Sequence, residues 1–168
     1  MRTPQFLKFE YDDNGPSLFP TAASWSLTDG RIKYVIIMPE DDWLGGDMDE
    51  RMLDDRFFRE HGAAPLDVFR EMNEDLAETT VFHDGLDPDV ELLEFLSQAL
   101  GQQAAFELAP MTALLHHASF EDLADRYQEM IGREKLDPSV AENAVYAQLL
   151  LAREEGLMDP GSMTDTPD

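Results

Sequence analysis

The sequence contains no cysteine, which excludes disulfide bonds and thiolate metal sites. Long apolar runs are missing as well. The opening residues, MRTPQFLKF, include no apolar stretch long enough for a signal peptide, and no later stretch approaches the length of a membrane span. We therefore expect a soluble, cytoplasmic protein that does not enter a membrane.

Basic residues are scarce. The chain has 12 Lys and Arg against 36 Asp and Glu, a formal charge of −24, and its lysines are Lys8, Lys33 and Lys135. Such a surface repels phosphate backbones, and no basic stripe with interleaved aromatic residues is present. The excess of acid is compatible with a salt-rich habitat, a basic protein partner, or mimicry of nucleic acid. Composition does not separate these three.

The chain length of 168 residues and a hydrophobic content of 43% suit a single domain with a sizeable core. We expect that domain over residues 1–156, followed by a disordered acidic tail over 157–168. Alternating and β-branched stretches predict strands at the ranges 6–11, 22–27, 31–38 and 79–83, with a weaker candidate at 105–108. The Asp-Gly pair within TDGR, residues 28–31, predicts a tight hairpin between the second and third strands.

Helical spacing and end signals predict helices that begin near Pro65, Pro88, Ser119 and Pro138. Asp87 is placed to cap the second of them, and Gly101 to end it. Residues 40–58 look like an excursion with one short helix. The resulting order, three strands followed by alternating helices and strands, predicts an α/β fold with a mixed sheet flanked by helices. It is the element order of the ribonuclease H-like fold.

The end of the first strand carries a cluster of acids in the stretch FEYDDN. Glu10 and Asp12 share one face of the strand because side chains alternate with period two. Two carboxylates at a strand end can hold Mg²⁺, and a pair of such ions can activate water for phosphodiester hydrolysis. The alternative is a solvated strand end, since acids occupy 36 of 168 positions. Residues 13–15, Asp-Asn-Gly, predict a turn.

Residues 9–43 resemble the opening of the DEDD-type 3′–5′ exonucleases, the relatives of proofreading subunits and ribonuclease T. That family carries D-x-E on its first strand, and the segment Glu10-Tyr11-Asp12 matches this motif with the two acids exchanged. In the family a later strand leads into a proline and often a tryptophan, and Pro39 and Trp43 fit that pattern. The resemblance implies a ribonuclease H-like fold with Glu10 and Asp12 as ligands of Mg²⁺ or Mn²⁺.

The resemblance continues over residues 62–96, where the family places its second catalytic aspartate near the start of a helix. Asp89 matches that position best. The alternative role for Asp89 is an acid in the first helical turn that offsets the helix dipole. For Asp87 we favour a helix cap.

The final block of the family contains a histidine five residues before the last aspartate, and the corresponding stretch here, LDPSVAENAVYAQLLLA, has none. Asp137 and Glu142 have the right spacing, so the resemblance implies Glu142 as the fourth acid and Asp137 in the position of the base. A helix cap is the simpler role for Asp137. Of the remaining histidines, His83 ends a predicted strand next to Asp84, and none has the family's position.

Two functions remain open. The first is a metal-dependent 3′–5′ exonuclease acting on single-stranded DNA or RNA, in which Glu10, Asp12, Asp89 and Glu142 hold the ions, with a site altered by the missing histidine. The second is a non-catalytic domain of the same fold whose acidic surface binds a basic protein or mimics nucleic acid. Convergence of these four acids would favour the first, and a salt-sensitive complex with a basic partner would favour the second.

Overall fold

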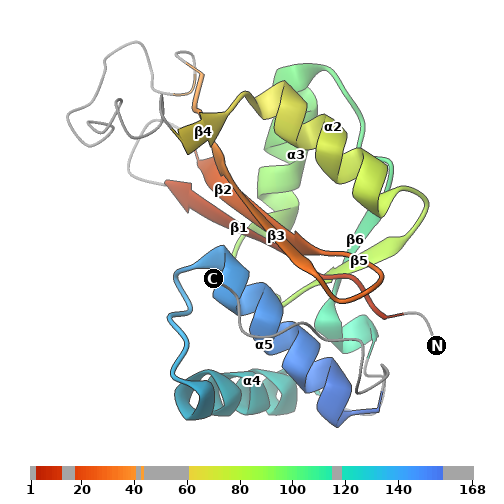
Figure 1. Ribbon diagram of the computed structural model, residues 1–168, viewed down its shortest axis with the longest axis vertical. Coiled ribbons are helices and arrows are strands. Elements are labelled where there is room, and N and C mark those ends of the chain that lie inside the picture. The colour runs from red at the N-terminus through yellow and green to blue at the C-terminus, as the bar shows by residue number, and fades with distance from the viewer. Residues whose placement is uncertain (1–2, 13–17, 41–42, 44–60, 115–118, 157–168) are drawn as a thin grey trace.

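The computed structural model of the chain describes residues 3–12, 18–40, 43, 61–114 and 119–156 (Figure 1). Most of the excursion predicted over 40–58 lies outside these ranges. So do the turn at 13–15, the pair His116 and His117, and the tail after Gly156.

The expected meander of three strands is present. Strands β1 (Leu7–Asp12), β2 (Phe19–Ser26) and β3 (Ile32–Ile37) pair antiparallel in that order, and the short β4 (Gly62–Ala63) adds to β3 in parallel. The predicted Asp29-Gly30 turn joins β2 to β3. Gly30 has a φ of 88°, and its N–H donates to the Leu27 carbonyl at 3.0 Å. A positive φ there is the reason that glycine suits this turn.

An irregularity in the β1–β2 pairing shapes the end of β1. Glu10 pairs with Ala22 whereas Tyr11 pairs with Pro20, so Thr21 is an extra residue in β2. Proline lacks the N–H that a regular ladder uses, which fits its place at a bulge. A bulge re-aims the side chains beside it, and this one lies at the end of β1 where the candidate acids occur.

The remaining strands form a separate two-stranded sheet, which meets the start of β1 through one isolated bridge. Strands β5 (Thr80–His83) and β6 (Glu107–Pro110) pair in parallel, and a parallel bridge between Phe6 and Phe82 places β5 beside the start of β1. The Phe82 N–H donates to the Gln5 carbonyl at 2.9 Å. The start of β1 therefore has β2 on one side and β5 on the other.

Helices cover both faces of these strands, two on each side (Figure 1). Helices α2 (Pro65–Leu76) and α3 (Asp89–Leu100) lie on one side, while α4 (Phe120–Glu134) and α5 (Ala141–Glu154) lie on the other. A 3₁₀ turn, η3 (Met111–Ala113), follows β6. Gly101 ends α3 with a φ of 63°, as predicted. Within the described ranges, no helix has the length and apolar character needed to cross a membrane.

Alternation along β1 divides its side chains between two cores. Leu7 and Phe9 are buried with Trp25 in the core beneath α2 and α3. Phe6 belongs to the core beneath α4 and α5. Lys8 and Glu10 have the parity of Phe6, and Glu10 accordingly bonds the backbone at the start of α5. Burial of each large apolar side chain contributes roughly 1.5–3 kcal/mol.

The expected α/β class with a mixed sheet is confirmed, but two predicted helix caps are wrong. Pro88 is the residue before α3, and no side chain caps that helix, because the Asp87 carboxylate is bound elsewhere. Helix α5 begins at Ala141 rather than at Pro138, and Asp137 instead accepts hydrogen bonds from the Ser139 N–H and hydroxyl at 2.9 and 2.7 Å. Asp137 therefore closes a local turn ahead of the helix.

Candidate functional site

The candidate site forms where the middle of β1 meets the segment between β5 and α3. That segment, residues 84–88, contains two aspartates, and a third, Asp89, is the first residue of α3. Lys8 extends from β1 toward all three. Its ammonium Nζ lies 3.0 Å from both carboxylate oxygens of Asp84, 2.5 Å from Asp87 Oδ2 and 3.7 Å from Asp89 Oδ2.

The charged groups of this cluster are largely removed from solvent. The side chains of Lys8 and Asp84 are each 4% exposed, that of Asp89 is 0% exposed, and only Asp87 reaches the surface at 35%. A buried charge is tolerated when it is paired and hydrogen-bonded. Lys8, with three carboxylates around one ammonium, meets that condition.

Hydrogen bonds from other elements hold the carboxylates in place. Tyr127 of α4 donates its hydroxyl to Asp84 Oδ2 at 3.0 Å, and Tyr11 donates to Asp87 Oδ1 at 3.0 Å. The Phe9 backbone N–H donates to Asp89 Oδ1, also at 3.0 Å. Because these donors come from β1 and α4, the cluster links the sheet to the helices on both sides.

The electrostatics of the cluster favour a charged lysine. Burial alone would lower the pKa of Lys8, but Asp89, Asp84 and Asp87 outweigh it and raise that pKa. Burial also acts to raise the pKa of Asp87, yet the hydrogen bond and charge of Lys8 together with the Tyr11 hydrogen bond outweigh it and lower that pKa. Asp89 behaves differently. Burial, reinforced by Asp84, raises its pKa to about 7 despite the attraction of Lys8.

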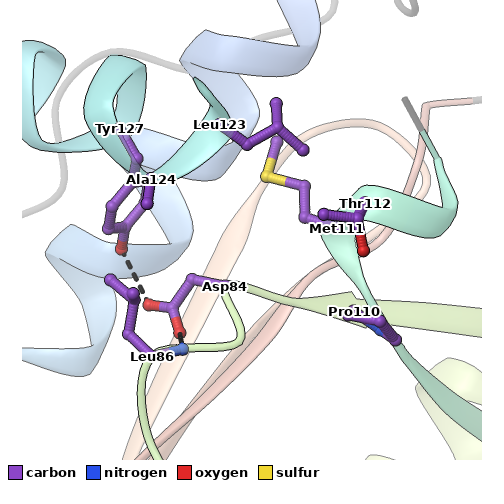
Figure 2. A pocket seen from close by; sticks show the side chains of 8 residues that line it. All are labelled: Asp84, Leu86, Pro110, Met111, Thr112, Leu123, Ala124 and Tyr127. Carbon is purple, nitrogen blue, oxygen red and sulfur yellow. Dashed lines mark hydrogen bonds between the residues drawn. The ribbon is translucent and has the colours of Figure 1, made fainter. Parts of the chain in front are cut away.

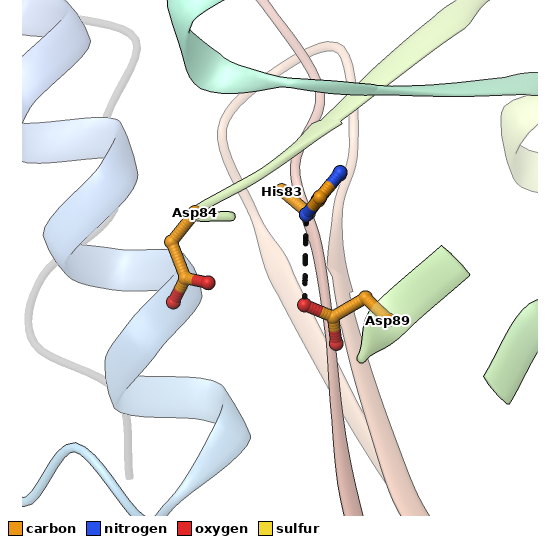
Figure 3. Close-up of side chains that lie close together, drawn as sticks. All are labelled: His83, Asp84 and Asp89. Carbon is orange, nitrogen blue, oxygen red and sulfur yellow. Dashed lines mark ion pairs between the residues drawn. The ribbon is translucent and has the colours of Figure 1, made fainter. Parts of the chain in front are cut away.

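His83 completes the cluster at the end of β5 (Figure 3). Its Nδ1 accepts a hydrogen bond from the Gly85 N–H at 3.1 Å and lies 3.7 Å from Asp89 Oδ2. Burial lowers the pKa of His83, so the ring is neutral at pH 7. Asp89 Oδ2 itself has no hydrogen-bond partner although it is buried.

The side chains of His83, Asp84 and Asp89 resemble a set of metal ligands. Each offers one ligand atom, and these atoms lie within 4.8 Å of one another. Carboxylate oxygens suit Mg²⁺, and a mixed nitrogen and oxygen set also suits Mn²⁺. The Lys8 ammonium, however, already contacts Asp84 and Asp89. The positive charge of this cluster is therefore supplied by the chain.

Two predicted ligands lie at the start of α5. Glu10 reaches it from β1 with its carboxylate, and Glu142 belongs to the first turn of the helix. Glu10 Oε2 accepts a hydrogen bond from the Ala141 N–H at 2.9 Å. Burial, then Glu10 and Glu142, raises the pKa of the Tyr34 hydroxyl, which places both acids within electrostatic range of that tyrosine. Asp89 instead contacts the Lys8 ammonium, so Glu10 and Glu142 both act on Tyr34 whereas Asp89 belongs to the Lys8 cluster.

The two other predicted site residues lie nearer the surface. Asp12 is the half-buried last residue of β1, paired with Phe19, and Asp137 is exposed in its turn. In the described part of the chain, the group within 4.8 Å includes neither of them, nor Glu10 or Glu142. A joint metal site therefore stays a prediction. Its proposed ligands are Glu10, Asp12, Asp89 and Glu142, with Asp137 as base.

An open cleft of about 420 Å³ runs beside the cluster. Glu10 and Asp87 line it, and the turn ahead of α5 contributes Pro138 and Ser139. Lys8 lines it as well. The cleft therefore exposes carboxylates to solvent and has room for a side chain of a partner.

A second hollow lies next to Asp84 (Figure 2). Its walls include Asp84 itself, Leu86, Met111, Leu123 and Tyr127. Its volume is about 10 Å³, the space of a single water-sized sphere. This hollow is too small for a ligand, and its apolar walls shield the bond from Tyr127 to Asp84.

The family resemblance assigns no role to two residues of the candidate site, Lys8 and Asp84. One signal for Lys8 was present in the sequence, because it is one of three lysines and stands inside the apolar stretch FLKF. A lysine is almost never fully buried unless it is paired. Its partners, 76 and 79 residues away, left no comparable signal.

No protein-family model, curated protein or solved structure matches the chain.

Proposed function

We propose that the chain is a ribonuclease H-like domain resembling the DEDD-type exonucleases that acts without catalysis, as an acidic domain binding a basic protein. The observation that carries the proposal is the position of Lys8. Its ammonium lies among Asp84, Asp87 and Asp89, and Asp89 is one of the acids that would hold a divalent ion in an exonuclease.

The strand arrangement supports the fold part of the proposal. Three antiparallel strands are followed by β5 and β6, and the Phe6–Phe82 bridge sets β5 parallel to β1. The spacing of Lys8 and Glu10 also equals that of the two acids in the D-x-E motif. In this alternative register lysine replaces the first acid, and Glu10 keeps the place of the second.

The charge of Lys8 supports the loss of metal chemistry. An ammonium 2.5–3.0 Å from Asp87 and Asp84 repels a divalent cation and occupies the oxygens that would bind it. Glu10 is likewise engaged, with its Oε2 on the Ala141 N–H. Two of the acids that the exonuclease requires, Glu10 and Asp89, therefore contribute to the internal structure.

The cleft supports the binding part of the proposal. Glu10 and Asp87 line it, and Asp137 and Glu142 flank the residues Pro138–Ala141 on its rim. With a formal charge of −24, the whole chain attracts cations over long distances. Arginine and lysine side chains of a partner, such as those of a nucleic-acid-binding groove, match this surface in charge.

The binding role is tested with a fluorescent arginine-rich peptide, whose anisotropy is followed at 50 and 300 mM NaCl. We expect salt-sensitive binding that weakens at least fivefold in the variant Glu10→Gln/Asp137→Asn/Glu142→Gln, which neutralises one acid that lines the cleft and the two that flank its rim residues. A control with the same charge change, Glu121→Gln/Asp125→Asn/Glu129→Gln on the exposed side of α4, should weaken it less than twofold. Equal effects of the two triple variants would show that only net charge matters and would contradict a binding cleft.

A second candidate, a metal-dependent 3′–5′ exonuclease, is favoured by one observation. Asp89 Oδ2 is buried without a hydrogen bond, as expected of a metal ligand whose ion is not bound. In this alternative Lys8 withdraws, Mg²⁺ or Mn²⁺ binds Asp89 with Glu10, Asp12 and Glu142, and Asp137 acts as base on a single-stranded 3′ end. Degradation of labelled oligonucleotides separates the two candidates.

A further inference from the structure

The Lys8 cluster has the composition of a cation site whose cation belongs to the protein. His83, Asp84 and Asp89 bring one nitrogen and two carboxylate oxygens within 4.8 Å of one another. Lys8 Nζ lies 3.0 Å from Asp84 Oδ1 and 3.7 Å from Asp89 Oδ2. The ammonium thus contacts two of the three side chains of this group, Asp84 and Asp89.

An independent observation indicates that the fit of the ammonium is incomplete. Asp89 Oδ2 is fully buried and accepts no hydrogen bond, since both Lys8 Nζ and His83 Nδ1 stop at 3.7 Å. A buried polar atom without a partner carries a desolvation cost of about 1–3 kcal/mol. A divalent ion such as Mg²⁺, bound at about 2.0–2.1 Å, would satisfy this oxygen. The Lys8 ammonium, at 3.7 Å, does not.

We propose that Lys8 is a tethered substitute for a divalent cation, and that removal of its ammonium opens a metal site formed by His83, Asp84 and Asp89. The inference rests on the non-catalytic part of the proposed function and is independent of the basic partner. It accounts for the burial of two carboxylates, Asp84 and Asp89, beside one lysine. In the natural chain the ammonium keeps divalent ions out of the cluster.

The experiment compares the natural chain with Lys8→Met, which keeps an unbranched side chain one atom shorter and removes its charge. Binding of Mn²⁺ alone is measured by the EPR signal of the free ion in 0.3 M KCl, which weakens binding to surface acids. Lys33→Met is the matched control. Lys33 also pairs with two carboxylates, Glu71 and Asp75, but at a half-exposed site, and its loss changes the net charge equally.

We expect Lys8→Met to bind one additional Mn²⁺ per chain, at least tenfold more tightly than the natural chain, and Lys33→Met to bind none. The double variant Lys8→Met/Asp89→Asn should lose the gain. Equal Mn²⁺ binding by Lys8→Met and Lys33→Met would overturn the inference. So would retention of the gain in the double variant, because Asp89 would then not be a ligand.

A measurement on the natural chain keeps the inference falsifiable if Lys8→Met does not fold. Mn²⁺ broadens NMR signals near its binding site, and the His83 ring protons report on the cluster. We expect these protons to stay sharp at Mn²⁺ levels that broaden the exposed acids. Selective broadening of His83 would overturn the inference. Selective broadening alone would not contradict the proposed non-catalytic function. That function would fail only if the same chain also degraded oligonucleotides, so failure of the inference and failure of the proposed function are distinguishable.

Discussion

The Lys8 ammonium lies 3.0 Å from both carboxylate oxygens of Asp84, a residue 76 positions further along the chain. This pair joins the middle of β1 to the segment that leads into α3. Asp87 and Asp89 approach the same ammonium, so one lysine fixes the start of that helix. The geometry, burial and charge of this cluster predict how its variants should behave.

Replacement of Lys8 by methionine should lower the free energy of unfolding by about 3–5 kcal/mol at pH 7, because it leaves buried carboxylates without their cation. Urea unfolding followed by circular dichroism measures the change. Lys33→Met is the control, since Lys33 is 34% exposed and its partner Glu71 is 43% exposed. We expect that control to lose about 1 kcal/mol or less. Equal losses in the two variants would contradict the account.

The Asp89 carboxyl should make stability depend on pH. Its pKa in the folded protein is about 7 against an ordinary value of 3.8, so the folded state binds more protons between these values. The contribution of Asp89 is full below about pH 4 and is lost as the pH rises through 7. The difference in unfolding free energy between the natural chain and Asp89→Asn should therefore fall by up to about 3 kcal/mol from pH 4.5 to pH 8. Parallel pH profiles would contradict this.

The Tyr127 hydroxyl should contribute more to stability than the Tyr11 hydroxyl. Each donates to an aspartate of the cluster at 3.0 Å, but Asp84 is 4% exposed and Asp87 is 35% exposed. Water can replace the donor at Asp87 and has little access to Asp84. Tyr127→Phe should therefore cost about 1.5–3 kcal/mol in urea unfolding, and Tyr11→Phe less than about 1 kcal/mol. A larger loss in Tyr11→Phe than in Tyr127→Phe would show that burial of the acceptor does not determine how much each hydroxyl stabilises the fold.

The Glu10 carboxylate should stabilise the start of α5. Its Oε2 accepts the Ala141 N–H at 2.9 Å, as a capping side chain would, and its charge suits the positive end of the helix dipole. Glu10→Ala should cost about 1 kcal/mol and accelerate hydrogen exchange of the Ala141 amide. Glu10→Gln, which keeps an acceptor, should cost less. Unchanged exchange in Glu10→Ala would argue that this bond is not formed in solution.

Local features of the fold could be predicted from the sequence. The Asp29-Gly30 hairpin and the end of α3 at Gly101 depend on a few neighbouring residues whose backbone preferences are strong. Strand β4 could not be predicted, because Gly62 and Ala63 form a strand only by pairing with Ile36 and Ile37. Its signal is a contact between distant parts of the chain.

The site was less accessible to prediction for the same reason. Local rules assigned Asp87 to a helix cap, but Lys8 and Tyr11, almost 80 residues away, bind its carboxylate instead. Asp89 was placed correctly at the start of a helix because proline and acid signals mark that point. Its approach to Lys8 depends on how α3 packs against β1, which spacing along the chain does not encode.

The most direct test of the central claim is an exonuclease assay on the natural chain. Single-stranded DNA and RNA oligonucleotides labelled at the 5′ end are incubated with Mg²⁺ and then Mn²⁺, and Asp12→Asn/Asp89→Asn is run in parallel to expose contaminating nuclease. We predict no shortening with either ion, because Lys8 supplies the cation of the cluster. Metal-dependent shortening by the natural chain, absent from the double variant, would contradict the account and establish the exonuclease.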